Sequence, residues 1–212
     1  NRNHWKKYLI YTWIIGLFLM GLLMKGGLFG LSSVESTKWG GLPLTLLLSV
    51  FGLTAAYPLG VILALGRRSK MPAIRMLSVL YIELIRGVPL ISLLFMSSVV
   101  FPLFLPEGVN INNIIRAQVA IILFTAAYIA EVVRGGLQAI PRGQYEAAES
   151  LGLNYYLTMR LIILPQALKI VIPPSVSILI SAFKDTSLVV IIALFDFLKT
   201  TKTVISYPQW LG

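Results

Sequence analysis

Long apolar runs separated by short polar segments dominate the chain. Five of these runs are long enough to cross a hydrocarbon core of about 30 Å, which takes about 20 helical residues. They cover roughly residues 8–24, 42–65, 76–100, 114–133 and 161–183. A sixth run, at 188–198, is too short to span comfortably. The pattern predicts an all-α, polytopic membrane helix bundle.

The Lys and Arg residues between these runs predict how the chain is oriented in the membrane. Segment 66–75 carries Arg67, Arg68, Lys70 and Arg75, and segment 134–160 carries Arg134, Arg142 and Arg160. Segments 28–41 and 101–113 are much poorer in basic residues. Because basic loops stay on the cytoplasmic side, we expect 66–75 and 134–160 in the cytoplasm, together with the N-terminus.

The composition supports a membrane protein and argues against a nucleic-acid-binding protein and against cysteine-dependent chemistry. Hydrophobic residues make up 57% of the 212 residues and charged residues 12%, against about 25% charged in a soluble domain. The formal charge of +10 does not indicate a nucleic-acid surface, because the basic residues lie between apolar runs as topology determinants do. The absence of cysteine excludes disulfides, thiolate metal sites and a cysteine nucleophile.

A soluble-looking stretch, RGQYEAAESLG, occupies residues 142–152 of the expected cytoplasmic segment. It is rich in good helix formers, so we expect a short helix. Gly143 is an acceptable N-cap, Gly152 suits the C′ position, and Asn154 is placed to cap the helix that follows.

The two faces of this expected helix differ. Tyr145, Ala148 and Gly152 fall near one stripe, and Glu146 and Glu149 fall on another. Small residues let the backbone of a partner come close, and the glutamates suit basic groups on it. Two interpretations stay open from the pattern: an amphipathic loop helix that lies on the membrane, and a helix that docks a partner protein.

Two charged pairs interrupt the apolar runs. Glu83 and Arg86, and likewise Glu131 and Arg134, are spaced i, i+3 and are neighbours on one helical face. A charge well inside a bilayer costs about 2.5 kcal/mol or more, so such residues face the bundle or a water-filled cavity. Each pair is either a structural salt bridge between helices or part of a solute pathway, and the structural reading is stronger for Glu131.

Arg86 has a specific functional reading. Counted from Met76 at the helical rise, it lies about 15 Å deep, near the midplane. A guanidinium can hold a carboxylate through two hydrogen bonds, so Arg86 is a candidate clamp for the α-carboxylate of an amino acid. Gly87 and Pro89 follow directly and predict a break in the helix there.

The polar tetrad Lys184-Asp185-Thr186-Ser187 interrupts the last long apolar stretch. A Lys-Asp couple with two hydroxyls is costly in lipid but useful beside a polar solute. A structural ion pair and a substrate contact are equally compatible with the pattern. In the second case Asp185 would receive an α-ammonium group.

The segment QYEAAESLGLNYYLTMRLIILPQA resembles the EAA loop of ABC-importer permeases. It carries Glu146-Ala147-Ala148, then Gly152, then an apolar run ending in Leu164-Pro165. IELIRGVPLISLLF, AYIAEVVRGGLQAIPRGQYEAA and AFKDTSLVVIIALFDF are similar to recurrent segments of the polar amino-acid permease family, in its general L-amino-acid branch. The resemblance runs from about residue 39 to residue 212.

This resemblance implies the permease fold of a type I ABC importer, with 142–152 as a cytoplasmic coupling helix. That helix would dock an ATPase subunit through Gln144, Tyr145, Glu146, Ala147, Ala148, Leu151 and Gly152. The substrate pathway is expected to include Glu83, Arg86, Glu131, Lys184, Asp185, Thr186 and Ser187. We expect residues 1–41 to form an N-terminal span and extracytoplasmic loop, and 42–212 the permease core without the last helix of the family.

The resemblance also implies partners. They are a second homologous permease, two ATP-binding subunits, an extracytoplasmic binding protein and an L-amino acid, all at a bacterial inner membrane. The chain has no G-x-x-x-x-G-K-[ST] motif, so ATP and magnesium would be held by the ATPase subunit and the chain would catalyse nothing itself.

Two other functions stay as alternatives. The buried charges would also suit a secondary transporter driven by an ion gradient. An intramembrane enzyme is disfavoured, because G-x-S-x-G, H-E-x-x-H and paired membrane aspartates do not occur in the sequence.

Overall fold

The structure is a computed structural model that describes residues 5–27, 30, 32–35 and 38–208. The regular structure of these residues is helical, apart from one isolated bridge between Gly41 and Asp196. The expected all-α class is therefore confirmed.

The chain has four long helices, and shorter helical elements lie between and after them. The long helices are α1 (Trp5–Lys25), α2 (Gly41–Arg67), α5 (Asn113–Gln138) and α8 (Leu164–Asp185). Between α2 and α5 lie α3 (Pro72–Arg86), α4 (Leu90–Phe95), the π-helical η2 (Met96–Val100) and the 3-10 helix η3 (Phe101–Phe104). Between α5 and α8 lie α6 (Arg142–Ser150), α7 (Tyr155–Thr158) and the π-helical η4 (Met159–Ile163). The 3-10 helix η5 (Thr186–Ile192) and α9 (Phe197–Ile205) follow α8.

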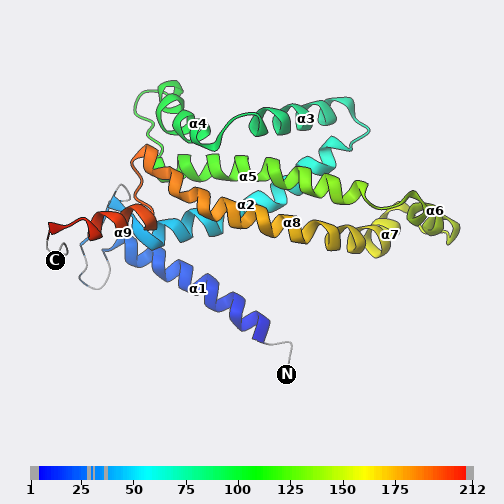
Figure 1. Cartoon of the computed structure of the whole chain (residues 1–212), viewed down its shortest axis with the longest axis horizontal. Helices are drawn as coiled ribbons and strands as arrows, with labels where there is room; N and C mark the ends of the chain where they lie inside the picture. The colour runs from blue at the N-terminus through cyan, green and yellow to red at the C-terminus, as the bar shows by residue number, and fades with distance from the viewer. Residues whose placement is uncertain (1–4, 28–29, 31, 36–37, 209–212) are drawn as a thin grey trace.

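Helix α5 is the centre of the bundle. Figure 1 shows α3 and α4 on one side of it and α8 on the other, with α2 crossing it, and all four helices contact it. Its contact with α2 is close because Gly60 faces Ile129: a Cβ added at Gly60 would lie 2.6 Å from Cγ2 of Ile129. Half of the most apolar 18-residue stretch of α5 is buried, whereas no side chain that the structure describes in the corresponding stretch of α1 is buried. Figure 1 shows α1 running obliquely away from the other helices.

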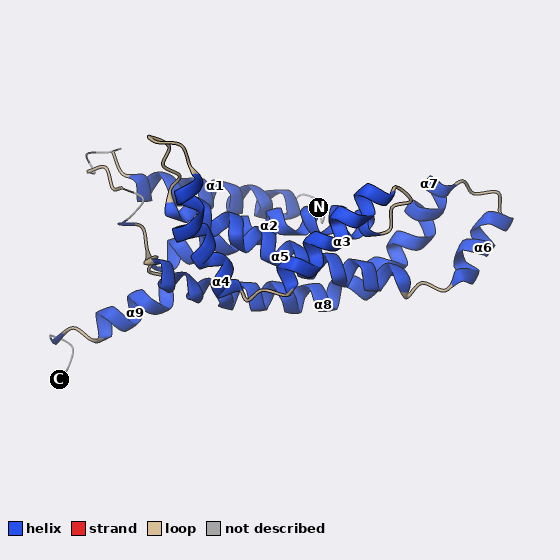
Figure 2. Ribbon diagram, turned by 90° about the horizontal axis from the view of Figure 1, so that it is seen from above, coloured by secondary structure: helices blue, strands red, loops and turns tan. Residues whose placement is uncertain are grey.

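The two ends of the bundle carry different segments. Helix α6 lies at one end, near the last residues of α2 and α5, and α9 projects from the other end (Figures 1 and 2). The segments 66–75 and 134–160, both expected in the cytoplasm, therefore lie at the same end. We refer to this end as cytoplasmic and to the end with α9 as extracytoplasmic.

The buried apolar side chains form two clusters along the bundle. The extracytoplasmic cluster includes Leu44, Leu48, Leu94, Ile121 and Val189. The cytoplasmic cluster includes Ala64, Ile82, Ile129, Leu137 and Ile163. Large apolar side chains such as those of Ile62, Leu80 and Ile180 stay exposed, as expected for surfaces that face lipid.

The expected span 76–100 is not one straight helix, and the prediction of a break in it is confirmed. Four helical stretches among the described residues are long and apolar enough to cross a membrane alone: Lys7–Lys25, Gly41–Arg67, Asn113–Gln138 and Tyr155–Ile192. A fifth crossing requires Pro72–Arg86 and Leu90–Phe104 as one span, bent by 102°. Since α2 ends at the cytoplasmic end and α5 begins at the other, the bent pair connects the two ends (Figure 1).

The bend has a local cause. Gly87 N–H still donates to the carbonyl of Glu83 at 2.9 Å. Pro89 has no N–H and disfavours the helical conformation at Val88, so α3 cannot continue. Pro89 instead takes φ −60°, ψ 144° and starts α4.

The last long span contains prolines and one irregular turn. Pro173 and Pro174 both lie inside the continuous α8. The irregularity lies earlier, in η4, where Pro165 has no N–H to donate to the carbonyl of Leu161. The short run 188–198 forms part of η5, a turn with Ala193 at φ 60°, and the start of α9.

Candidate functional site

Helix α6 has the expected C-terminus but a different N-terminus. Pro141, with ψ 143°, is the N-cap, and Gly143 lies inside the helix, so the prediction for Gly143 is wrong. At the other end Gly152 takes φ +71° and donates to the carbonyl of Glu149 at 2.8 Å. Leu153 N–H donates to the carbonyl of Ala148 at 3.1 Å. This pair of hydrogen bonds is a Schellman motif. The motif requires a positive φ at the position of Gly152, which glycine adopts without strain.

The prediction that Asn154 caps the next helix is confirmed. Its Oδ1 accepts from Leu157 N–H at 3.0 Å. The αL glycine that ends α6 and the cap that begins α7 are separated by a single residue, so the turn between the two helices is tightly determined by local chemistry.

One face of α6 packs on the chain itself. Ala148 is fully buried, and Tyr145 packs against the cytoplasmic cluster. Oε1 of Gln144 accepts from Nε2 of Gln166 in α8 at 2.8 Å. These three residues were expected to contact a partner, but Ala148 cannot do so, and Gln144 and Tyr145 are engaged within the chain. Small size at position 148 serves packing under the helix.

The other face of α6 is exposed. It presents Glu146, Ala147, Glu149 and Gly152, together with Leu151, whose exposed fraction is 75%. Tyr155, at the start of α7, is also 78% exposed. The part of the expected docking set that is free for a partner is thus Glu146, Ala147, Leu151 and Gly152.

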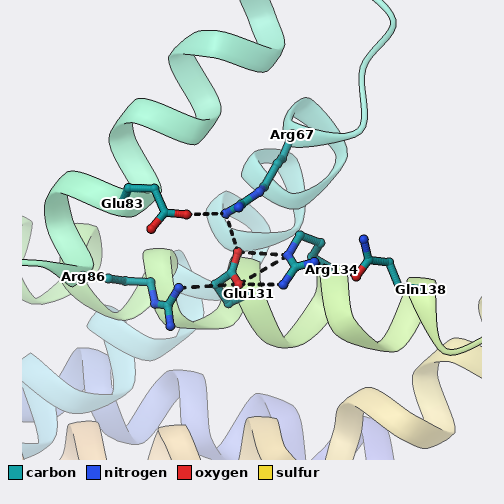
Figure 3. A network of polar contacts seen from close by, with 6 residues as sticks. All are labelled: Arg67, Glu83, Arg86, Glu131, Arg134 and Gln138. Atoms are coloured by element: carbon teal, nitrogen blue, oxygen red, sulfur yellow. Dashed lines mark hydrogen bonds and ion pairs between the residues drawn. The ribbon is translucent and has the colours of Figure 1, made fainter.

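Five charged side chains from three helices meet near the cytoplasmic end of α5 (Figure 3). Glu131 lies at the centre of this charged cluster, and its side chain is only 17% exposed. Its carboxylate lies 2.6 Å from Arg67 of α2, 2.9 Å from Arg134 and 3.5 Å from Arg86 of α3. A carboxylate withdrawn from water needs such partners, because an unpaired buried charge is strongly unfavourable.

The charged cluster corrects the pairing suggested by the i, i+3 spacing. Glu131 and Arg134 do pair, through two guanidinium nitrogens of Arg134. Glu83 and Arg86 do not pair with each other: Glu83 lies 3.0 Å from Arg67, and Arg86 reaches Glu131. The two charged segments therefore connect across helices, because the tertiary positions of Arg67 and Glu131 offer better partners than the local neighbour does.

The guanidinium of Arg86 lies beside Glu131, which is seven residues or about 10 Å from the end of α5. Cζ of Arg86 also lies 5.6 Å from the ring centroid of Tyr128, within the range of a cation–π contact. Its side chain stays 35% exposed, so the guanidinium has room for a further anion.

A cavity of about 330 Å³ opens between α5 and α8, and its lining is mixed, with the apolar side chains of Phe124, Ile178 and Ala182 beside hydroxyl and carboxylate groups. We call it the polar cavity for these hydroxyl and carboxylate groups. Its lining includes Thr125 and Tyr128 of α5, and Ser177, Ser181 and Asp185 of α8. Asp185 is partly buried and has no ion-pair partner among the described residues. Tyr128 connects Asp185 with Arg86, because it lines the cavity that contains Asp185 and its ring contacts the guanidinium of Arg86.

The other residues of the KDTS tetrad are placed differently. Lys184 is exposed and forms no ion pair with Asp185 within the described chain, so the local Lys-Asp couple is not present. Thr186 is buried, and its hydroxyl donates to the carbonyl of Phe183 at 2.7 Å. Ser187 is half-buried. Asp185 alone of the four lines the polar cavity.

Several functional candidates were not predicted as site residues. Arg67 was assigned only to orientation, although it joins two carboxylates. Tyr128 and Gln138, which accepts from Nη1 of Arg134 at 2.6 Å, carried no signal of their own. Tyr128 and Glu131 are spaced i, i+3 and therefore lie on one helical face. This spacing was the signal in the sequence that could have placed Tyr128 near the charged cluster.

A bundle of apolar helices around a partly buried charged cluster, with an exposed helix at one end, is the architecture of a multi-pass integral membrane protein. A family model described as binding-protein-dependent transport system inner membrane component matches residues 56–211, well over half of the chain. The chain therefore belongs to this family and is a multi-pass protein of the inner membrane.

Relatives of known name are similar over most of the chain. The inner membrane amino-acid ABC transporter permease protein YhdY of Escherichia coli K12 is 56% identical over 209 residues, which is 99% of this chain and 57% of that protein. The glutamate/glutamine/aspartate/asparagine transport system permease protein BztC of Rhodobacter capsulatus is 52% identical over 183 residues, 86% of this chain and 42% of that protein. The chain thus spans about half the length of these two relatives.

A solved structure shares the fold. A crystal structure of an amino acid ABC transporter with histidines superposes with a TM-score of 0.72 at 32% identity, covering 80% of this chain and 78% of that one. The resemblance to amino-acid ABC-importer permeases and the permease fold expected from it are confirmed by these comparisons.

Proposed function

We propose that the chain is the transmembrane permease subunit of an ATP-driven importer of L-amino acids. It would work with a second homologous permease, two ATP-binding subunits that hold ATP and magnesium, and an extracytoplasmic binding protein. The observation that carries this proposal is the arrangement of α6, which is fixed to the bundle by one face and presents the other at the cytoplasmic end.

The inner contacts of α6 suit a coupling helix. The Gln144–Gln166 hydrogen bond, the buried Ala148 and the packed Tyr145 connect α6 directly to η4 and α8. A movement of α6 would therefore be passed to α8, the helix that carries Asp185. The exposed Glu146, Glu149 and Leu151 offer two charges and one large apolar side chain to an ATPase subunit.

The substrate route is proposed to pass the polar cavity. An amino acid carries one ammonium and one carboxylate group, and this region offers the complementary charges. Asp185 would receive the α-ammonium inside the cavity, and Arg86, which lies 5.6 Å from the ring centroid of the cavity-lining Tyr128, would attract the α-carboxylate at another point of the route. The hydroxyls of Thr125, Ser177 and Ser181 supply hydrogen-bond partners for a polar solute that leaves water.

Within this proposal, Glu131 orients Arg86 and does not meet the substrate. Three arginines surround it, so its carboxylate has little capacity for another ligand. The structural reading of Glu131, which the sequence already favoured, is therefore the better one. Glu83, paired with Arg67 on the outer side of the charged cluster, has the same structural role.

Co-purification and an ATPase assay test the proposal. The protein, expressed together with the proposed second permease and ATP-binding subunits, is expected to retain an ATP-binding subunit, and ATP hydrolysis should rise when binding protein loaded with an L-amino acid is added. A panel of amino acids identifies the substrate. ATP hydrolysis that does not respond to any loaded binding protein would contradict the proposal. Uptake that needs no ATPase and collapses with an uncoupler would favour the alternative of an ion-driven transporter.

A further inference from the structure

A strongly basic cavity lies at the cytoplasmic end of the bundle, outside the proposed substrate route. It has a volume of about 360 Å³ and is lined by Arg67, Arg68, Arg75, Val79, Arg134 and Gln138. The four arginines come from three places: the end of α2, the first turn of α3 and the last turns of α5. Side chains far apart in the sequence thus bring positive charge to one space.

The charge in this basic cavity is only partly neutralised. Arg67 and Arg134 pair with Glu131 beneath the cavity. Arg68 and Arg75 form no ion pair with any described residue and are exposed. Like charges that converge without a counter-charge repel one another, so the cavity is suited to an anion that accepts from several guanidinium groups at once, as a phosphate does.

An apolar groove adjoins the basic cavity. Its lining includes Pro72, Met76, Val79 and Leu80 along the outer face of α3, with Ser69, Lys70, Arg75 and Glu83 at its edge. Val79 and Arg75 line both spaces. Met76 and Leu80 are 65% and 58% exposed. Glu83 does not oppose an anion here, since Arg67 lies 3.0 Å from its carboxylate.

We propose that this pair of spaces binds an anionic phospholipid of the cytoplasmic leaflet. The phosphate would lie among Arg67, Arg68 and Arg75, with Lys70 at the mouth, and an acyl chain would follow the groove along α3. Basic pockets between helices on the cytoplasmic side suit such headgroups. The continuity with an apolar groove favours a lipid over a free phosphate. A free phosphate has no apolar part that could cover the exposed Met76 and Leu80.

This lipid site does not depend on the proposed transport function, because it rests on the cavity, the unpaired arginines and the groove alone. It lies where α2 is joined to α3. A bound phosphate would share Arg67 and Arg134 with Glu131, so the lipid would hold the start of α3 against the ends of α2 and α5.

Native mass spectrometry of the full chain in detergent tests the proposal, with phosphatidylglycerol and phosphatidylcholine of the same acyl chains added in equal amounts. The unmodified protein is expected to retain phosphatidylglycerol preferentially. The double variant Arg68→Gln/Arg75→Gln, which leaves every ion pair of Glu131 in place, should bind it about 30-fold more weakly, the effect of two basic groups at a membrane surface. The matched control Arg142→Gln/Arg160→Gln removes the same charge elsewhere at this end and should change the affinity less than about threefold.

Three results would overturn the lipid site. The first is equal retention of both lipids by the unmodified protein, and the second is equal loss in the double variant and the control. The third concerns the source of the phosphate: inorganic phosphate or chain-free glycerophosphoglycerol that displaces phosphatidylglycerol at equal concentration would assign the cavity to a soluble anion. Unchanged melting temperatures of both variants establish that any loss of lipid is not caused by unfolding.

Discussion

Arg67, the last residue of α2, places its Nη1 2.6 Å from Oε1 of Glu131 in α5, although 64 positions separate the two residues in the sequence. The same nitrogen lies 3.0 Å from Oε1 of Glu83 in α3. One guanidinium therefore joins three helices at the cytoplasmic end, and the centre of this joint is the carboxylate of Glu131.

Glu131→Gln should destabilise the protein strongly. The substitution leaves Arg67, Arg86 and Arg134 close together without a counter-charge, and removal of one partner from a buried ion pair costs about 3–5 kcal/mol. We expect the apparent melting temperature in detergent to fall by about 10 °C. Glu83→Gln is the matched control: its side chain is 55% exposed, so the loss should stay below about 1 kcal/mol. Equal effects of the two variants would contradict the central role of Glu131.

Gly60→Ala should loosen the contact between α2 and α5. The added Cβ would lie 2.6 Å from Cγ2 of Ile129 and 2.9 Å from the carbonyl of Ala126, so the helices must separate, at a cost of about 1–3 kcal/mol. Gly135→Ala is the control, because a Cβ there meets nothing within 4 Å. Thermal unfolding of both variants measures the difference, and a stable Gly60→Ala variant would mean that the two helices are not packed this closely.

Gly152→Ala should fray the turn between α6 and α7. Position 152 takes φ +71°, which costs a residue with a Cβ about 1 kcal/mol. Amide hydrogen exchange at residues 152 and 153, whose N–H groups close the Schellman motif, is expected to be about fivefold faster. Gly143→Ala, inside α6 with a free Cβ position, should leave exchange there unchanged or slower. Faster exchange in both variants would show that the capping motif is not responsible.

The features that were predictable from sequence are those set by local chemistry. Gly152 and Asn154 end α6 and begin α7 as expected, because each acts on backbone groups within a few residues. Gly87 and Pro89 predicted the break after α3 for the same reason. The start of α6 was misplaced because Pro141 supplies the extended backbone there, and Gly143 is not needed for it.

The features that were not predictable depend on how distant helices meet. The i, i+3 rule correctly joined Glu131 to Arg134, but Glu83 and Arg86 have better partners on other helices. Ala148 was expected to face a partner protein, since a small residue is equally suited to an outer docking face and to an inner packed one. Only the position of α6 over the bundle decides between them.

Asp185→Asn should weaken amino-acid transport if the polar cavity is the route. Loss of the negative charge removes the proposed partner of the α-ammonium, and the loss of a charged hydrogen-bond partner corresponds to about 10–100-fold in KM for uptake. Lys184→Gln, adjacent but exposed and outside the cavity, is the matched control and should transport normally. Uptake by Asp185→Asn with unchanged KM would exclude this residue from the route.

Arg86→Ala tests the other end of the proposed substrate. Without the guanidinium the α-carboxylate loses its partner, so KM should rise by about 10-fold or more. Because Arg86 also contacts Glu131 at 3.5 Å, the melting temperature is measured alongside. The clamp hypothesis fails if Arg86→Ala leaves the KM for uptake unchanged. It also fails if Arg86→Lys is as stable as the unmodified protein and Arg86→Ala raises KM no more than Arg86→Lys does.

We propose that the chain is a permease driven by a separate ATPase, which acts through the exposed face of α6. The most direct measurement is ATP-dependent uptake of a labelled L-amino acid into liposomes that contain the complete transporter, with Glu146→Lys/Leu151→Asp against Arg142→Gln as control. We expect uptake that requires ATP and binding protein, is lost in the double variant and persists in the control. Full uptake by the double variant, or uptake without ATP, would contradict it.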